Sequence, residues 1–195
     1  MTAGTFRIRP RDRNALAVLV PGLFVGLWLT IPLAAQPKPK PTDYQVKAAY
    51  LSDFGRFVEW SSRAKPSPEE SFDLCVLGPD PFGPALDAAI AGERIGGAAL
   101  TARRIARPQE ALGCRILFIA SPETNQLEAI LTTLGTASVL TVGDMPDFVK
   151  RGGMIQFVLD GNRVRFEINI PASRHAGLNL SSELLKLARA VRRAP

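Results

Sequence analysis

Apolar residues that follow residue 42 recur with the spacing of a helix. Between residues 43 and 60 they fall at intervals of three and four, which predicts an amphipathic helix with one buried face. Thr42 or Asp43 can cap its N-terminus, because either side-chain oxygen can accept a hydrogen bond from a backbone N–H of the first turn. Lys47 interrupts the apolar face, so its charge needs a separate explanation.

Short apolar runs farther along the chain predict strands. Three such runs are residues 72–77, 114–120 and 138–142, and residues 100–105 are expected to form a further strand. A β-hairpin follows at residues 154–159 and 163–170, because the connecting turn Asp160-Gly161-Asn162 contains the Asp-Gly pair that tight hairpins favour. The runs at residues 72–77 and 114–120 both lead into helices, so we expect them to lie parallel and adjacent in one sheet.

Helical spacing between these runs completes the fold prediction. Residues 84–91 and 122–134 predict helices, and a last helix begins at Asn179 or Ser181. Its buried side would consist of Leu180, Leu184, Leu187, Ala188 and Val191. Strand–helix alternation followed by a hairpin predicts an α/β fold, namely a three-layer sandwich with a mixed, mostly parallel sheet, a C-terminal β-hairpin and flanking helices.

The first 35 residues predict export across a membrane. Four arginines within residues 7–13 precede residues 15–33, which carry no charge and end in Leu33-Ala34-Ala35. This is the order of a secretory signal that is cleaved after Ala35. An uncleaved anchor is the alternative, because the run approaches the roughly 20 residues of a spanning helix. Both interpretations place the rest of the chain in the periplasm. The expected organisation is an export signal at residues 1–35, a Pro/Lys linker at residues 36–42 and a single domain at residues 43–193.

Two cysteines, Cys75 and Cys114, lie in the exported part of the chain. An oxidising compartment favours a disulfide between them, and two buried free thiols are the alternative. The two thiols and the single histidine, His175, are too few ligands for a structural zinc site, so no metal is expected.

Charge and candidate catalysts argue against several classes of function. The chain has 24 basic and 18 acidic side chains, but the excess lies largely in the leader and the Arg-rich tail, so no nucleic-acid partner is expected. We interpret residues 78–83 as a plain turn and His175 as a solvated or capping residue. A hydrolase built on Ser173 or Ser181 with His175 is the weakest alternative, because neither serine lies in a nucleophile elbow. These residues favour a binding module without a cofactor over an enzyme.

Two charged residues break the apolar pattern of their elements. Lys47 lies on the apolar face of the first helix, and Glu167 lies within the second strand of the hairpin. They either reach solvent or pair with one another and bind a polar ligand where the helix meets the sheet. Asp144 is expected to cap the short segment at residues 145–150.

A contact with another protein would need an exposed apolar patch. The candidates are Phe57 and Trp60 at the end of the first helix, and Met145 and Phe148 in the loop at residues 144–151. The alternative is that these four side chains belong to the core.

Several short blocks resemble the YfiR family of periplasmic regulators in their order and spacing. The blocks are residues 44–51 (YQVKAAYL), 57–60 (FVEW), 75–78 (CVLG), 80–83 (DPFG), 114–119 (CRILFI), 140–144 (LTVGD), 152–155 (GGMI), 165–169 (RFEIN), 177–178 (GL) and 184–188 (LLKLA). The similarity extends from Tyr44 to about Val191, which is nearly the whole of the expected domain.

This resemblance implies a regulator without enzymatic activity. A protein similar to YfiR would bind the periplasmic sensor domain of an inner-membrane diguanylate cyclase and hold the enzyme inactive, which lowers cyclic-di-GMP and biofilm formation. The resemblance also implies a disulfide between Cys75 and Cys114. Members can carry a further cysteine pair, which this chain lacks, so a redox switch resting on that pair does not follow here.

The expected partner is therefore an inner-membrane diguanylate cyclase or another membrane signalling protein, and two copies of the chain could also form a homodimer. The alternative function is that of a periplasmic small-molecule-binding sensor that acts with a transporter or a histidine kinase.

Overall fold

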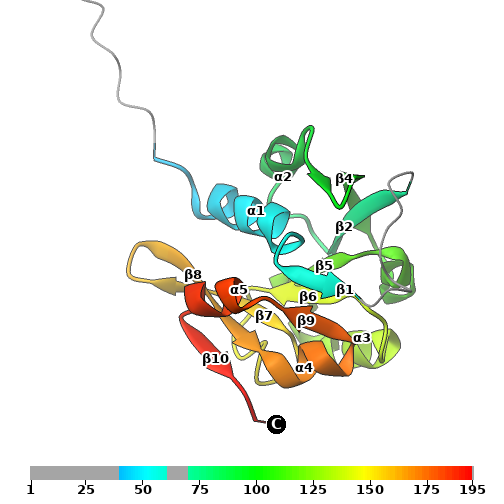
Figure 1. Cartoon of the computed structure of the whole chain (residues 1–195), viewed down its shortest axis with the longest axis vertical. Coiled ribbons are helices and arrows are strands. Elements are labelled where there is room, and N and C mark those ends of the chain that lie inside the picture. The colour runs from blue at the N-terminus through cyan, green and yellow to red at the C-terminus, as the bar shows by residue number, and fades with distance from the viewer. Residues whose placement is uncertain (1–39, 61–69, 195) are drawn as a thin grey trace, which may run out of the picture. The chain divides into compact units, whose positions relative to one another are not determined.

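The computed structural model describes residues 40–60 and 70–194, and its centre is an eight-stranded sheet (Figure 1). The predicted export signal, and the linker as far as residue 39, lie outside the described residues. In spatial order the strands are β10 (Ala190–Arg192), β8 (Arg163–Asn169), β7 (Ile155–Asp160), β6 (Leu140–Gly143), β5 (Ile116–Ile119), β2 (Ser71–Leu77), β4 (Ala98–Ile105) and β3 (Arg94–Ile95).

The sheet is mixed and mostly parallel, as predicted. Neighbouring strands run in parallel except β7 with β8 and β3 with β4. The antiparallel β7–β8 pair is the predicted hairpin, in which Asp160 lies opposite Arg163. The order of the strands reverses at β2, which has β4 on one side and β5 on the other. In open α/β sheets a ligand site is expected beyond the carboxyl ends of the strands at such a reversal.

Successive residues of the central strands contribute to two separate cores, because side chains alternate between the faces of a strand. In β2, Leu74 and Val76 belong to the larger core, whereas Cys75 and Leu77 belong to the smaller one. The larger core also includes side chains of α1 (Asp43–Phe54), α2 (Pro84–Ile90), α4 (Ile170–His175) and α5 (Ser182–Leu187), and the smaller one those of α3 (Leu127–Leu134) and η1 (Pro108–Gly113). Helices therefore cover both faces of the sheet, which confirms the predicted three-layer sandwich.

The first helix is shorter than its apolar spacing predicts. Thr42 caps α1 through a reciprocal pair of hydrogen bonds with Gln45, as one of the two expected caps. The helix ends at Phe54 rather than Trp60, and the chain continues as β1 (Val58–Trp60), which pairs antiparallel with β9 (Leu178–Leu180). Backbone pairing with a strand more than 100 residues away therefore overrides the helical pattern, and β-branched and aromatic residues such as Val58 and Trp60 suit a strand.

The last helix is also shorter than predicted. Ser181 caps α5, and its hydroxyl accepts a hydrogen bond from the Leu184 N–H at 3.2 Å. The helix stops at Leu187, which is 54% exposed rather than buried, and Val191 lies in β10. The prediction of a continuous helix was wrong because β10 pairs with β8 in parallel, a contact that no local pattern reveals.

Two further elements differ from the sequence prediction. The predicted helix at residues 122–134 begins as the 3₁₀ helix η2 (Ser121–Gln126) and becomes α-helical only in α3. The polar segment around His175, where no helix was predicted, forms α4, which Asn169 caps by accepting a hydrogen bond from the Ala172 N–H at 3.2 Å. Within the described residues, no helix is both long and apolar enough to cross a bilayer.

Candidate functional site

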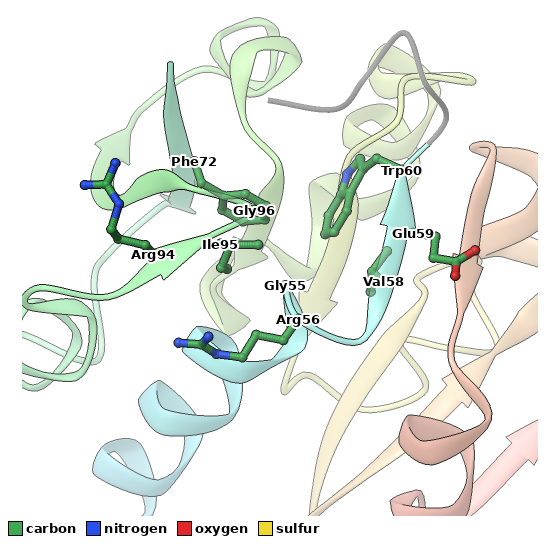
Figure 2. Close-up of a pocket in the computed structure, with 9 residues that line it drawn as sticks. All are labelled: Gly55, Arg56, Val58, Glu59, Trp60, Phe72, Arg94, Ile95 and Gly96. Atoms are coloured by element: carbon green, nitrogen blue, oxygen red, sulfur yellow. The ribbon is translucent and has the colours of Figure 1, made fainter. Parts of the chain in front are cut away.

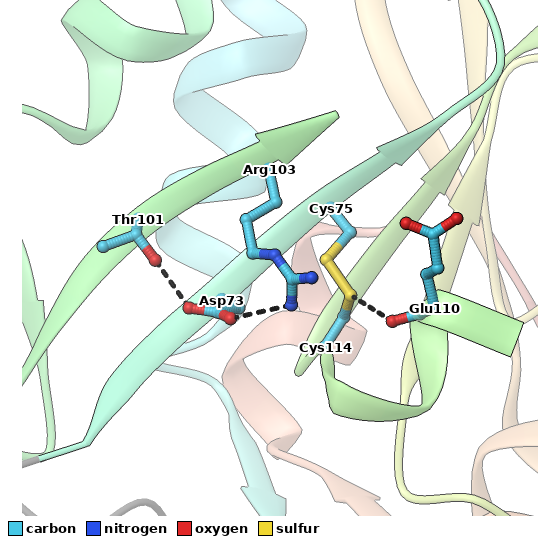
Figure 3. Close-up of a disulfide and its surroundings, with 6 residues drawn as sticks. All are labelled: Asp73, Cys75, Thr101, Arg103, Glu110 and Cys114. Atoms are coloured by element: carbon cyan, nitrogen blue, oxygen red, sulfur yellow. Dashed lines mark hydrogen bonds and ion pairs between the residues drawn. A yellow bond between two sulfur atoms is a disulfide. The ribbon is translucent and has the colours of Figure 1, made fainter. Parts of the chain in front are cut away.

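A disulfide joins Cys75 and Cys114 in the smaller core (Figure 3). Cys75 lies within β2, and Cys114 lies two residues before β5, which pairs with β2 in parallel. This pairing brings the two Cα atoms to 6.0 Å, a usual separation for a disulfide. The predicted bridge is confirmed, and the alternative of two free thiols is wrong.

Asp73 forms a polar contact between β2 and β4 close to the disulfide (Figure 3). Thr101 donates a hydrogen bond to its carboxylate at 2.6 Å and Arg103 donates another at 3.2 Å. Burial acts to raise the pKa of Asp73, but hydrogen bonds from Ser71, Thr101 and Arg103 outweigh it and hold this pKa below its usual range. The carboxylate therefore serves to fix the pairing of two neighbouring strands.

A second set of polar side chains converges at the carboxyl edge of the sheet. Asp144 follows β6, Ser121 follows β5, and Tyr44 and Lys47 project from α1. The Asp144 carboxylate accepts hydrogen bonds from Lys47 Nζ at 2.6 Å, from the Ser121 hydroxyl at 2.6 Å and from the Tyr44 hydroxyl at 3.0 Å. We refer to these four residues as the Asp144 cluster.

Burial and charge oppose one another in the Asp144 cluster. Only 10% of the Lys47 side chain and 7% of the Asp144 side chain are exposed. Burial acts to raise the pKa of Asp144, but hydrogen bonds from Lys47 and Ser121 and the charge of Lys47 outweigh it, so the pKa lies below its usual range. Burial first, and the nearby Asp144 charge second, raise the pKa of Tyr44 to about 12. The carboxylate is therefore ionised at neutral pH and the phenol is protonated.

The Asp144 cluster closes the edge of the sheet where an α/β protein of this topology would hold a ligand. The Tyr44 ring packs edge-on against Phe82, which follows β2, with 5.5 Å between the ring centroids. Lys47 Nζ lies 4.2 Å from the centroid of the same Tyr44 ring. The charged atoms of Lys47 and Asp144 are buried and paired with one another, so their arrangement joins α1 to the sheet.

Three expectations about charged residues in this region were wrong. Lys47 pairs with Asp144 and not with Glu167, whose carboxylate accepts a hydrogen bond from Arg189 at 3.3 Å. Lys47 also does not reach solvent, because a buried carboxylate lies close enough to neutralise it. Asp144 does not cap residues 145–150, because its carboxylate is occupied by side chains from α1 and from the end of β5.

The proposed apolar patch is largely buried. Met145 and Phe148 have no exposed surface and pack in the smaller core, so for these two side chains the alternative of core burial is confirmed. A Cβ at Gly143 or Gly153 would overlap the Phe148 ring, which shows how closely the loop folds over this side chain. Trp60 is only 6% exposed, and its indole N–H donates a hydrogen bond to the Ser138 carbonyl oxygen at 3.1 Å. Phe57 is half-buried.

A pocket of about 480 Å³ lies between the end of α1, β1 and the β3 edge of the sheet. Figure 2 shows the side chains of Trp60, Phe72 and Ile95 gathered on its apolar side, whereas the guanidinium groups of Arg56 and Arg94 extend away from Trp60. The Trp60 and Phe72 rings meet edge-to-face with 5.2 Å between centroids. We call this space the Trp60 pocket, and its volume is that of a site for a small metabolite.

The described residues do not assemble a catalytic triad around His175. The Ser173 hydroxyl is buried and donates to the Ile170 carbonyl oxygen at 2.9 Å, and the Ser181 hydroxyl caps α5. His175 is exposed at the end of α4. Within the same residues, no group of three or more His, Cys, Asp or Glu side chains could hold a metal ion.

The turn at residues 78–83 is stabilised by local contacts. The Asp80 carboxylate accepts a hydrogen bond from the Phe82 N–H at 2.8 Å and from Arg104 Nε at 3.0 Å. Arg104 also donates a hydrogen bond to the Asp87 carboxylate at 2.7 Å, and this bond first, then the bond that Arg104 donates to Asp80, raises the pKa of Arg104. The interpretation of this segment as a plain turn therefore agrees with its geometry.

Sequence reasoning identified Lys47 but missed its partners. Lys47 and Asp144 are separated by 97 residues, so no local pattern connects them. A signal did exist, because Ser121 and Asp144 each follow a buried parallel strand and such strand ends meet at one edge of a sheet. A buried lysine that breaks an apolar helix face then requires a carboxylate at that edge.

Comparisons with known proteins find a family model that matches this chain and solved structures that resemble it. A family model described as YfiR/HmsC-like, DUF4154, matches residues 44–189. A solved structure of a conserved domain protein from Vibrio cholerae is 11% identical, with a TM-score of 0.55, over 77% of this chain and 60% of that chain. This likeness shows a shared fold, and the chain spans about 60% of the length of that relative. An ABC domain from Streptococcus pneumonia, solved in complex with L-Trp, is 10% identical with a TM-score of 0.49 over 74% of this chain and 60% of that chain.

Proposed function

We infer that this protein represses a membrane enzyme by binding it, because the chain belongs to the YfiR/HmsC-like family of periplasmic regulators. The proposed partner is an inner-membrane diguanylate cyclase, and the proposed contact is with the periplasmic sensor domain of that enzyme. Binding would hold the cytoplasmic catalytic domain inactive, and the level of cyclic-di-GMP and biofilm formation would fall.

The observation that carries this proposal is the extent of the family match, which spans residues 44–189 and so nearly all of the described domain. The geometry supports a role in binding rather than in catalysis. At the carboxyl edge of the sheet, the charged atoms of Lys47 and Asp144 are buried against one another. The Trp60 pocket is lined by apolar side chains and by charged residues that point away from it (Figure 2).

Repression by binding has a defined energetic requirement. A sensor domain that exchanges between an active and an inactive form is shifted by a partner only as far as the partner prefers one form. Moving such a domain from about 99% active to about 99% inactive requires a preference of about 10⁴-fold. A protein–protein interface can supply this preference without any chemical step.

The experiment is a reconstitution with purified components. Membranes that contain a diguanylate cyclase from the same organism are incubated with GTP and with increasing amounts of the purified domain, and cyclic-di-GMP is measured. We expect dose-dependent inhibition and co-purification of the two proteins. A domain that binds none of the organism's membrane cyclases, or that turns over GTP or cyclic-di-GMP by itself, would contradict the proposal.

The Trp60 pocket favours a second candidate function, which is that of a small-molecule sensor acting with a transporter or a histidine kinase. A ligand in this pocket would raise the melting temperature of the isolated domain without any protein partner. Gly96→Asn provides a matched variant, because Asn tolerates the positive φ of 59° and a Cβ there meets no atom within 4 Å. If the pocket is the site, a ligand that stabilises the wild type should stabilise this variant less.

A further inference from the structure

A groove crosses the face of the molecule that is formed by α3, α4, β10 and the segment between β6 and β7. It consists of two hollows with volumes of about 450 Å³ and about 350 Å³. Gly152, Ala172 and His175 line both hollows, so the two adjoin one another. We call this feature the basic groove. It shares no lining residue with the Trp60 pocket, the Asp144 cluster or the disulfide.

The larger hollow of the basic groove has an apolar floor. Leu134, Val139 and Met154 are buried there, and Leu131 of α3 is partly exposed beside them. These side chains come from α3 and from the segments that precede β6 and β7. A recessed apolar floor of this kind can receive an apolar side chain of a binding partner and exclude water from it.

Three cationic side chains line the groove, two from the segment between β6 and β7 and one from β10. Lys150 and Arg192 line the smaller hollow, Arg151 lines the larger one, and His175 lies where the two meet. Glu128 is the single acidic residue among the lining residues of either hollow. The groove therefore carries a surplus of positive charge along its length.

This surplus is only partly neutralised within the described residues. Lys150 pairs with the exposed carboxylate of Asp147 at 2.7 Å. Arg151 donates to the Thr124 carbonyl oxygen at 2.7 Å, and Arg192 donates to the Ala194 carbonyl oxygen at 3.0 Å. Since carbonyl oxygens carry no net charge, both guanidinium groups remain available to a carboxylate of another molecule.

We propose that the basic groove binds an acidic, partly apolar segment of the exported domain of the partner protein. The proposal rests on the proposed function, and it specifies the chemistry of the contact. Carboxylates of the segment would meet Lys150, Arg192 and Arg151, and an adjacent apolar side chain would enter the larger hollow. Complementary charge along an open groove also speeds the encounter of two proteins and fixes their register.

The form of the groove favours a chain segment over other acidic ligands. A free anion such as phosphate needs a compact set of buried donors, whereas these cations are exposed and spread over two hollows. An anionic membrane surface would contact exposed cations, but its headgroups would leave the recessed apolar floor unfilled. An extended segment can satisfy the charges and the floor together.

The test uses defined peptides and the ¹⁵N-labelled domain. The probe is a synthetic peptide with the repeat Glu-Leu-Glu-Ser, and the control peptides replace every Glu by Lys or every Leu by Ser. We expect chemical-shift changes of Leu131, Met154, His175 and Arg192 with the probe and much weaker binding of both controls. Affinity should fall as the salt concentration rises.

Charge reversal within the chain provides a matched control. We expect Lys150→Glu combined with Arg192→Glu to weaken binding of the probe about tenfold or more, because two favourable exposed contacts become repulsive. Arg163→Glu reverses an exposed charge at the opposite end of β8 from Asn169, which lines the groove, and should leave the affinity unchanged. Equal melting temperatures of the three proteins would show that the substitutions act on binding and not on folding.

Several results would overturn the proposal. The first is that the control peptides, with Glu replaced by Lys or Leu replaced by Ser, bind as tightly as the probe. The second is that inorganic phosphate alone produces the same chemical-shift changes as the probe. The third is that phosphatidylglycerol vesicles bind with the same dependence on Lys150 and Arg192.

The same variants are also tested against the exported domain of each membrane cyclase of the organism. If no cyclase domain binds the wild type although the probe does, the proposed function fails while the chemistry of the groove stands. If a cyclase domain binds the wild type and the charge-reversed variant equally, the groove proposal fails while the proposed function stands.

Discussion

The disulfide and the Asp144 cluster both join distant segments of the same domain, but they do so by different physics. The disulfide links β2 to the segment just before β5 by a covalent bond within the smaller core. The Asp144 cluster links α1 to the ends of β5 and β6 by charge and hydrogen bonds. The first link is lost only on reduction, whereas the second depends on the ionisation of its members. The comparison therefore distinguishes the disulfide, which stabilises the sheet, from the Asp144 cluster, which attaches α1 to the sheet.

The two links also differ in how they stabilise the domain. A bond that closes a chain segment between two central strands fixes the scaffold on which any binding surface lies. A buried ion pair adds less to stability, because the cost of removing two charges from water offsets much of their attraction. Such a pair is sensitive to the loss of one partner, so the attachment of α1 depends on keeping both charges.

Removal of the disulfide should have the largest effect on stability. Cys75 and Cys114 are 39 residues apart, and the double variant Cys75→Ala, Cys114→Ala should lose about 4 kcal/mol of unfolding free energy because the unfolded chain regains loop entropy. Urea denaturation of the wild type and the variant, each with and without dithiothreitol, measures this loss. Dithiothreitol should destabilise the wild type and leave the variant unchanged. A wild type that is indifferent to the reductant at equilibrium would contradict the prediction.

Loss of the carboxylate of the Asp144 cluster should have the next largest effect. Asp144→Asn leaves the buried Lys47 ammonium without a counter-charge and should reduce the unfolding free energy by about 3 kcal/mol. Asp147→Asn is the matched control, because it removes an exposed carboxylate three residues away that pairs with Lys150. The control should change stability by less than about 0.5 kcal/mol.

A second substitution sharpens this test. In the variant Lys47→Met, Asp144→Asn, the unpaired charge is gone and much of the lost stability should return, because an apolar side chain then occupies the buried position. Urea midpoints of the two single variants and the double variant complete a double-mutant cycle. Additive effects, with no coupling between the two positions, would contradict the pairing of Lys47 with Asp144.

Sequence patterns predicted the elements whose conformation is decided locally. The hairpin follows from Asp160-Gly161-Asn162, and the adjacency of the strands at Cys75 and Cys114 follows from strand–helix alternation. Both predictions were confirmed because each rests on turn chemistry or on a general rule for parallel strands.

The sequence failed where a distant partner decides the conformation. Residues 58–60 and 190–192 continue apolar helical patterns, yet both are strands because β9 and β8 offer unpaired backbone groups at those places. The Asp144 cluster shows the same contrast between local patterns and distant partners. Lys47 was recognised because it breaks a local pattern, but its partner was not, because 97 residues separate it from Asp144.

The two links should also respond differently to acid. The pKa of Asp144 lies below its usual range in the folded state, so its contribution is present above the unfolded pKa of about 4 and is lost as pH falls through the folded value. Unfolding free energies measured between pH 6 and pH 3 should therefore fall less steeply for Asp144→Asn than for the wild type. The variant that lacks the disulfide should parallel the wild type, because cysteines in a disulfide do not titrate. Asp73 accounts for part of the slope that remains, since its pKa is also lowered.

The smallest expected effect lies at alkaline pH and concerns Tyr44. Because the folded state raises the pKa of Tyr44 to about 12, above the unfolded value of about 10, its contribution to stability is complete below pH 10 and is lost as pH rises toward 12. The chain has two tyrosines, so the absorbance of tyrosinate during a pH titration can be assigned by comparing the wild type with Tyr44→Phe. We expect the variant to lack the part of the titration that is centred near pH 12. If the titration curve kept that part, the Tyr44 hydroxyl would not be held against the Asp144 carboxylate, and the attachment of α1 would rest on Lys47 and apolar packing alone.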